Sequence, residues 1–303
     1  HLQANPRPHQ VAAISDVVSG LKNEDRGQLI MACGTGKTLT ALWIAEQLSA
    51  GRVLVLVPTL SLVAQTIREW SLNTNIRFEY CVVCSDETVT GKDSAVTSTS
   101  ELGVPVTTDP DVICQFLEDT VGRAVVFSTY QSSHKIAEAQ TKTRAQFDLA
   151  IADEAHRCAG GTEGRFGIIL NEESIRARKR LFMTATPKYF REHVKQRARE
   201  EEYELASMDD REVFGEVFHS LEFSKSIELG LLSDYRVVVI GVTDRETKRF
   251  AEEGRLVRTD DGISTDARTL AAQIGLSKAM RKYGLKKIIT FHSSIARATR
   301  FSS

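Results

Sequence analysis

The chain has 303 residues, of which 42% are hydrophobic and 26% are charged, and its formal net charge at pH 7 is −1. This composition is ordinary for a soluble globular protein, and the length allows one large domain or two smaller ones. No apolar run reaches the roughly 18 residues that a membrane span needs, so we expect no membrane contact. A net charge near zero gives no global attraction to nucleic acid, so such a partner has to be argued from local features.

Short apolar runs alternate with amphipathic stretches along the first two thirds of the chain. Several of the apolar runs lack the alternation of a half-exposed strand, which is typical of parallel strands covered on both faces. The strands are expected at residues 29–31, 53–57, 80–83, 124–127, 149–152 and 181–183. The helices are expected at residues 11–21, 37–48, 61–70 and 111–119. Repeated strand–helix units of this kind predict a doubly wound α/β fold with a mostly parallel sheet.

Two stretches interrupt this pattern. Residues 86–108 are rich in Ser, Thr, Asp and Gly and predict an exposed loop, whereas the highly charged residues 191–211 predict a solvated helix followed by a linker. A second strand–helix pattern then begins. Its strands are expected at residues 235–242 and 287–291, and its helix at residues 269–283.

The five cysteines are odd in number and scattered, which fits reduced thiols, and the chain opens with polar residues rather than a secretory signal. We therefore expect a cytoplasmic protein. Cys81 and Cys84 have the spacing of a metal or redox pair, but they lie in an apolar run with no second pair or nearby His. They are interpreted as strand residues.

The strongest motif is Met-Ala-Cys-Gly-Thr-Gly-Lys-Thr at residues 31–38, directly after a predicted strand and at the start of a helix. Glycines allow the backbone to curl so that its N–H groups point at phosphate oxygens, and the helix N-terminus adds positive potential. Lys37 would contact the β- and γ-phosphates, and the Thr38 hydroxyl would bind Mg²⁺. Met31 stands where the usual pattern has its first Gly, so the match is one residue short.

A second motif is an acidic pair, Asp153 and Glu154, at the end of the apolar strand 149–152. In an open α/β sheet, ligands gather at the carboxyl ends of the strands. Asp153 would hold Mg²⁺, and Glu154 would orient and deprotonate an attacking water. Taken alone, such a pair is more often a solvated turn or a helix cap. The upstream phosphate loop reverses that preference.

Three motifs in this order, Gly-Lys-Thr (36–38), Asp-Glu-Ala-His (153–156) and Thr-Ala-Thr-Pro (184–187), resemble motifs I, II and III of the DEAD/DEAH-box helicases of superfamily 2. Arg-Pro-His-Gln (7–10) resembles the upstream glutamine motif, Pro-Thr-Leu (58–60) motif Ia, and Ser-Thr-Tyr-Gln (128–131) motif Ib. Within the superfamily, the motifs most resemble the motor domains of type I and type III restriction enzyme R subunits and related bacterial helicase-domain proteins. The resemblance implies a RecA-like P-loop NTPase domain over residues 1–219. A linker and the truncated start of a second RecA-like domain are expected over residues 220–303.

The resemblance also implies roles for matching positions. The expected ATP-binding set is Arg7, Gln10 (reading the adenine edge), Cys33, Gly34, Thr35, Gly36, Lys37, Thr38 and Leu39. The expected catalytic set is Lys37, Asp153, Glu154 and His156, with Mg²⁺ held by Thr38 and Asp153. The residues expected to couple the nucleotide and nucleic-acid sites are Thr184, Ala185 and Thr186. The expected contacts to a nucleic-acid backbone are Pro58, Thr59, Ser128, Thr129 and Tyr130.

The interpretation stays open for Tyr130 and for one cluster of basic residues. Tyr130 offers a base-stacking face, but a buried core tyrosine is at least as well supported. The basic residues Arg176, Arg178, Lys179 and Arg180 form either a backbone-contact patch or, as we prefer, a solvated run of charge.

The expected function is an ATP- and Mg²⁺-dependent helicase or translocase, with DNA, and double-stranded DNA in particular, favoured over RNA. The resemblance to restriction enzymes leaves open whether a nuclease or methyltransferase domain or subunit accompanies this chain. The arginine-rich motif of the second motor domain has no match after Phe291, so this chain is expected to bind ATP weakly and to hydrolyse it poorly. The alternatives are an RNA helicase, a phosphate-loop ATPase without a nucleic-acid partner, and a nucleotide-gated clamp without efficient turnover.

Overall fold

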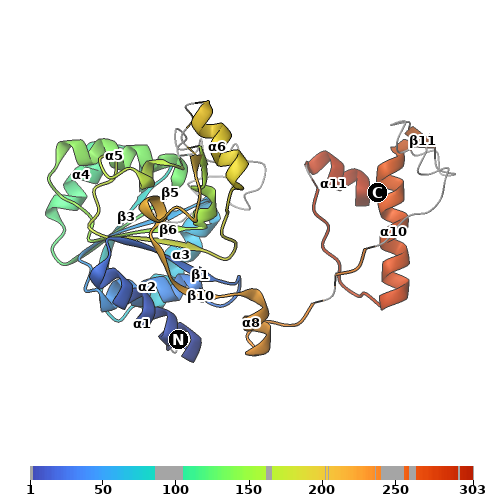
Figure 1. The fold of residues 1–303 in the computed structure, drawn as a ribbon, viewed down its shortest axis with the longest axis horizontal. Helices are drawn as coiled ribbons and strands as arrows, with labels where there is room; N and C mark the ends of the chain where they lie inside the picture. The colour runs from blue at the N-terminus through green and yellow to red at the C-terminus, as the bar shows by residue number, and fades with distance from the viewer. Residues whose placement is uncertain are drawn as a thin grey trace. The chain divides into compact units, whose positions relative to one another are not determined.

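The structure is a computed structural model that describes residues 3–85, 105–161, 166–201, 203, 205–235, 237–239, 256–258, 264–292 and 294–302. It divides into two compact units, His1–Ser233 and Asp234–Ser303, which are described separately. The first unit contains the central sheet (Figure 1).

The central sheet has eight strands in the order β10-β1-β8-β6-β2-β5-β3-β4, and every neighbouring pair is parallel. The six strands predicted between residues 29 and 183 and the mostly parallel α/β sheet are confirmed. The strands are β1 (Arg26–Met31), β2 (Arg52–Val57), β3 (Phe78–Val83), β4 (Val106–Thr107), β5 (Arg123–Thr129), β6 (Leu149–Asp153), β8 (Arg180–Thr184) and β10 (Glu216–Leu221).

Both faces of the sheet are covered, as the continuous apolar runs predict. In β2, Val53 and Val55 belong to a core cluster with side chains of α1, α2 and α3, whereas Leu54 and Leu56 belong to a second cluster with side chains of α4 and α5. Figure 1 shows α1 and α2 on one side of the sheet and α4 and α5 on the other. The helices are α1 (Pro8–Asn23), α2 (Lys37–Gln47), α3 (Leu60–Asn73), α4 (Pro110–Asp119), α5 (Ser133–Lys142), α6 (Glu192–Glu200), α7 (Arg211–Phe214) and α8 (Phe223–Glu228).

Some segments of the first unit differ from expectation. Val106–Thr107, expected in a loop, form β4 beside β3, while residues 86–104 of that loop lie outside the described residues. After α6, the expected linker instead contains β9 (Leu205–Ala206), which pairs antiparallel with β7 (Gly160–Gly161). The boundary expected after residue 219 falls inside β10, which pairs with β1, and the first unit continues to Ser233.

The second unit contains the antiparallel pair β11 (Leu256–Arg258) and β12 (Ser264–Asp266), and the helices α10 (Ala267–Tyr283) and α11 (Ile295–Ser302). The predicted helix at 269–283 is confirmed. The predicted strand at 287–291 is wrong, since these residues form no regular structure. Ile289 and Phe291 are 81% and 94% exposed, and in the described part of this unit no strand pairs with them. The described residues of the expected strand at 235–242 are likewise not in a strand.

Cys81 lies in strand β3, as expected, and Cys84 is the first residue after this strand. Both are free thiols. Of the helices described, none has an apolar stretch long enough to cross a bilayer.

Candidate nucleotide-binding and hydrolysis site

Three adjacent strands bring the two main motifs together. β8 lies between β1 and β6, and all three run parallel, so their carboxyl ends meet at one edge of the sheet. The glycine-rich turn follows β1, and the acidic pair lies at the end of β6. Burial raises the pKa of Asp153, and the positive charge of Lys37 opposes this rise, as expected for two motifs at the same edge of the sheet.

The turn after β1 has the shape of a phosphate cradle. Gly34 and Gly36 have φ angles of 83° and 88°, a left-handed conformation that side chains rarely adopt. Thr35 Oγ1 donates a 2.7 Å hydrogen bond to the Ala32 carbonyl and tightens the turn. Helix α2 begins at Lys37 without a side-chain cap from its N-cap residue, so its first N–H groups are available to an anion. These features fit a triphosphate.

Side chains of helix α1 form hydrogen bonds with this turn. Gln10 Nε2 donates to the Gly36 carbonyl at 3.1 Å and to Thr40 Oγ1 at 3.3 Å, and Gln10 Oε1 accepts from the Arg7 amide at 3.0 Å. Both ends of the Gln10 amide are therefore used within the chain, and an adenine contact by Gln10 stays a prediction. His9, which sequence reasoning overlooked although it lies inside the same motif, has Nε2 2.9 Å from the Thr35 carbonyl.

The other expected ATP-binding residues lie along the turn and the first turn of α2. Lys37 is largely buried, and its Nζ donates to the Met31 carbonyl at 3.2 Å. Cys33 is exposed, Thr38 and Leu39 are half-buried, and the indole N–H of Trp70 donates to the Thr38 carbonyl at 3.0 Å. Trp70 was not predicted at this site, because its bond is to a backbone carbonyl that leaves no sequence signal.

The acidic pair occupies the end of β6. Asp153 is 8% exposed, and burial, reinforced by the neighbouring Glu154 charge, raises its pKa to about 6. Glu154 is half-buried with a φ of 52°, and its amide donates to Asp153 Oδ1 at 2.9 Å. A buried carboxylate and the Thr38 hydroxyl are oxygen ligands of the kind that Mg²⁺ takes, and a divalent cation would restore the charged form of Asp153. The residues present therefore fit Mg²⁺.

His156 connects the acidic motif with the end of β8. Its Nδ1 lies 3.0 Å from Thr184 Oγ1 and 3.4 Å from Glu154 Oε2. The Thr186 amide also donates to Thr184 Oγ1, at 3.1 Å, across the half-buried Ala185. Burial lowers the pKa of His156, although Glu154 opposes that effect. All the expected coupling residues thus lie in one hydrogen-bonded segment beside the carboxylates.

The expected nucleic-acid contacts lie at the same edge of the sheet, at the end of β5 and directly after β2 and β5, but most of their side chains face inward. Ser128 and Thr129 are fully buried and donate to the Val83 carbonyl and to Ser132 Oγ. Pro58 is buried, and Thr59 caps α3 by accepting from the Leu62 amide.

Tyr130 is a core residue in this structure. It is fully buried, and its hydroxyl donates to the Asp153 carbonyl at 2.6 Å. The base-stacking interpretation is wrong for this conformation, because the ring presents no free face.

The basic run that ends in the first residue of β8 is not a solvated patch, contrary to the interpretation that we preferred. Arg180 is 2% exposed and donates to the carbonyls of Ile169, Ala177 and Ile175. Arg176 and Lys179 also donate to backbone carbonyls, while the side chain of Arg178 remains largely exposed. The buried Arg180 therefore stabilises the backbone of the segments before β8.

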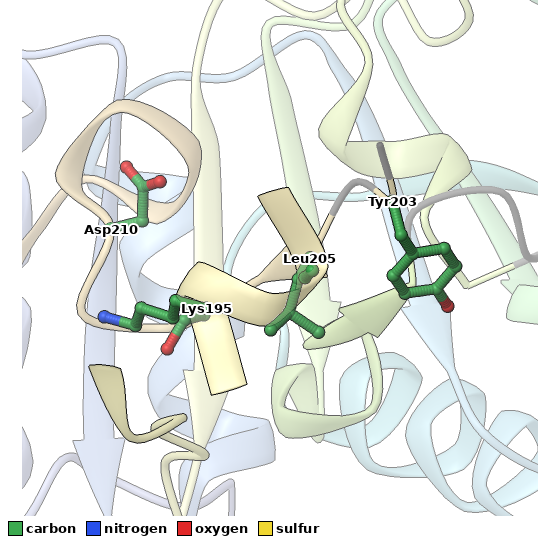
Figure 2. A pocket seen from close by; sticks show the side chains of 6 residues that line it. Lys195, Tyr203, Leu205 and Asp210 are labelled. Atoms are coloured by element: carbon green, nitrogen blue, oxygen red, sulfur yellow. The ribbon is translucent and has the colours of Figure 1, made fainter. Parts of the chain in front are cut away.

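A separate pocket of about 310 Å³ lies beside α6 and β9 (Figure 2). Its lining residues are Lys195, Ala198, Tyr203, Leu205, Ser207 and Asp210. The Lys195 ammonium is already paired with Asp209 at 2.7 Å, so its charge is compensated within the chain. None of the expected site residues lines this pocket.

Comparison with known proteins agrees with the motifs. Residues 3–189 match the family described as type III restriction enzyme, res subunit. The probable helicase A859L of African swine fever virus is 30% identical over 236 residues, which are 77% of this chain and 24% of that protein.

Two solved structures are also similar. The ATP-dependent type ISP restriction-modification enzyme LlaBIII bound to DNA has a TM-score of 0.73 and 33% identity, over 92% of this chain and 19% of that one. A nuclease-deletion mutant of the type ISP enzyme LlaGI, in complex with a DNA substrate mimic, has a TM-score of 0.59 and 32% identity, over 83% of this chain and 22% of that one. The chain spans about a quarter or less of each of these relatives.

Proposed function

This chain belongs to the family of the type III restriction enzyme res subunit, and we propose that it is the ATP-binding part of a motor that moves on double-stranded DNA. Its helicase-family relatives support a helicase or translocase role. The observation that carries the proposal is the placement of the phosphate loop and the Asp153–Glu154 pair on either side of β8.

Each part of the site has a task in this proposal. The N–H groups at the start of α2 and the Lys37 ammonium bind the phosphates, and Thr38 and Asp153 hold Mg²⁺. Bound Mg-ATP supplies the phosphoanhydride bond whose hydrolysis drives movement. The Glu154 carboxylate orients a water and accepts its proton. His156 and Thr184 connect this carboxylate to the loop after β8.

DNA is favoured over RNA because two relatives more than 30% identical are described as bound to DNA or to a DNA substrate mimic. The loops after β2 and β5 are the proposed contacts, since they lie at the same edge of the sheet as the phosphate loop. The hydroxyls of Ser128 and Thr129 are used internally, so contacts from these loops would come from backbone N–H groups or from a rearranged loop.

The isolated chain is proposed to turn ATP over slowly, because the described part of its second unit offers no arginine-rich motif. Such an arginine contributes about 10³ to 10⁵ in rate in phosphoryl transfer. Nuclease or methyltransferase companions remain part of the proposal.

The test is ATP turnover in the full-length protein with duplex DNA, duplex RNA or no nucleic acid, combined with binding measured over a range of salt concentrations. We expect stimulation by duplex DNA and a linear loss of log affinity with log salt, as phosphate contacts require. Stimulation by RNA alone supports an RNA helicase. ATP turnover that neither DNA nor RNA stimulates supports an ATPase without a nucleic-acid partner. Tight nucleotide binding without turnover supports a clamp.

A further inference from the structure

The peptide bond that joins the two carboxylates is held at both of its polar groups. The Tyr130 hydroxyl donates to its carbonyl, that of Asp153, at 2.6 Å. The amide of the same peptide, that of Glu154, donates to Asp153 Oδ1 at 2.9 Å. Only the first of these bonds comes from outside the acidic motif.

This peptide determines where the Glu154 carboxylate points. Glu154 has a φ of 52°, a left-handed conformation that a residue with a side chain keeps only where its surroundings impose it. Rotation of the 153–154 peptide would release this conformation and redirect the carboxylate. The Tyr130 hydroxyl opposes such a rotation.

Tyr130 belongs to the segment that directly follows β5, and contacts on two sides hold it there. Its ring packs against Phe166 with centroids 5.2 Å apart, and its carbonyl accepts a 2.7 Å hydrogen bond from Ser133 Oγ. It follows Ser128 and Thr129 directly, so a shift of this loop moves the hydroxyl that holds the acidic peptide.

We propose that Tyr130 is a positioning residue that transmits the state of the loop after β5 to the carboxylate of Glu154. The proposal rests on the proposed function, because that function places Glu154 in ATP hydrolysis and the loop after β5 on the nucleic-acid side. It adds a direct connection between these two places that does not pass through His156 and Thr184.

The first test is Tyr130→Phe in the full-length protein, which removes the hydroxyl and leaves the ring in place. We expect Mg-ATP affinity to stay within about twofold, and kcat with duplex DNA to fall about tenfold, the size of one lost hydrogen bond in a transition state. The control is Cys158→Ala, because the buried Cys158 side chain interacts with the Tyr130 hydroxyl, and its removal does not take away the bond that this hydroxyl donates to Asp153. Wild-type kcat in Tyr130→Phe, or an equal fall in both variants, overturns the proposal.

A second measurement does not depend on turnover. Hydrogen exchange at the Glu154 amide, followed by mass spectrometry of the peptide around residues 150–156, should be about tenfold faster in Tyr130→Phe and unchanged in Cys158→Ala. Equal exchange in Tyr130→Phe and wild type overturns the proposal. If the wild-type protein hydrolyses no ATP, the proposed function fails, and the exchange rate still decides the role of Tyr130.

Discussion

His156 Nδ1 and Thr184 Oγ1 lie 3.0 Å apart, so the acidic motif at the end of β6 and the threonine motif at the end of β8 share a hydrogen bond. Thr184 Oγ1 also accepts from the Thr186 amide, which fixes the turn that follows. The two motifs are therefore linked directly through the side chains of His156 and Thr184.

Replacing Thr184 with Val removes both bonds and preserves the shape of a fully buried side chain. We expect ATP hydrolysis with duplex DNA to stay within about threefold of wild type, and movement along DNA to fall about tenfold, because the loss of one or two hydrogen bonds is of this size. Displacement of a third strand from a DNA triplex measures movement. Parallel losses of hydrolysis and displacement would argue against a coupling role.

Lys37→Ala and Glu154→Gln should separate nucleotide binding from hydrolysis. Removal of the Lys37 ammonium should abolish Mg-ATP binding. Glu154→Gln should keep affinity within a few-fold and lower kcat by about 10² to 10⁴, the usual contribution of a general base. Titration with a fluorescent ATP analogue and a phosphate-release assay give the two quantities. The control is Lys22→Ala, at an exposed lysine near the end of α1. Equal ATP consumption by the wild type and all variants would contradict the proposed mechanism.

The raised pKa of Asp153 makes stability depend on pH. The folded protein binds this proton more tightly than the unfolded chain, since the pKa rises from its ordinary value of 3.8 to about 6. The stabilisation is therefore fully present below about pH 4 and is lost as pH rises through about 6. Without Mg²⁺, Asp153→Asn should then be more stable than wild type above pH 6, by up to about 3 kcal/mol, and equally stable below pH 4.

Chemical denaturation of both proteins between pH 4 and pH 8 measures this difference. Asp119→Asn, which removes a carboxylate from the exposed end of α4, should follow the wild-type curve. A constant difference between Asp153→Asn and wild type at every pH would contradict the assignment to Asp153.

Gly36→Ala should damage the phosphate loop for two separable reasons. Its φ of 88° strains any side chain, and an added Cβ would lie 2.6 Å from Gln10 Nε2. Gly122→Ala is a matched control, because Gly122 has a φ of 98° and nothing within 4 Å of an added Cβ. We expect a loss of about 1 kcal/mol from backbone strain in both variants and a larger loss in Gly36→Ala. Thermal unfolding and ATP binding test this, and Gln10→Ala should recover part of the stability of Gly36→Ala by removing the clash.

Much of the first unit and the outline of the site were predictable from the sequence. The runs that form β2 and β6 are apolar throughout because both faces of the sheet are covered, and the two main motifs follow strands whose ends meet. Helix α5 and strand β10 were missed. The first begins Ser-His-Lys and is rather polar, and the second is an edge strand whose burial is only partial. At 287–291, an apolar run predicted a strand, but a strand also requires a neighbour to pair with.

The contacts within the site were harder to predict from the sequence. The bonds of Gln10, Trp70 and Tyr130 all include backbone carbonyls as acceptors, at Gly36, Thr38 and Asp153. Every residue has such a carbonyl, so sequence patterns cannot distinguish the one that is used. Tyr130 is a core residue because its side chain is fully buried, and a sequence pattern does not reveal this burial.

Helix α3 has a mechanical consequence for the loop that precedes it. Thr59 caps its start, and Trp70, near its end, is bonded through the indole to Thr38 in the first turn of α2. A helix of 14 residues is about 21 Å long and resists compression along its axis. α3 therefore links the loop after β2 with the first turn of α2 through a single helix, so a displacement of Thr59 would be passed on to the phosphate-binding end of α2.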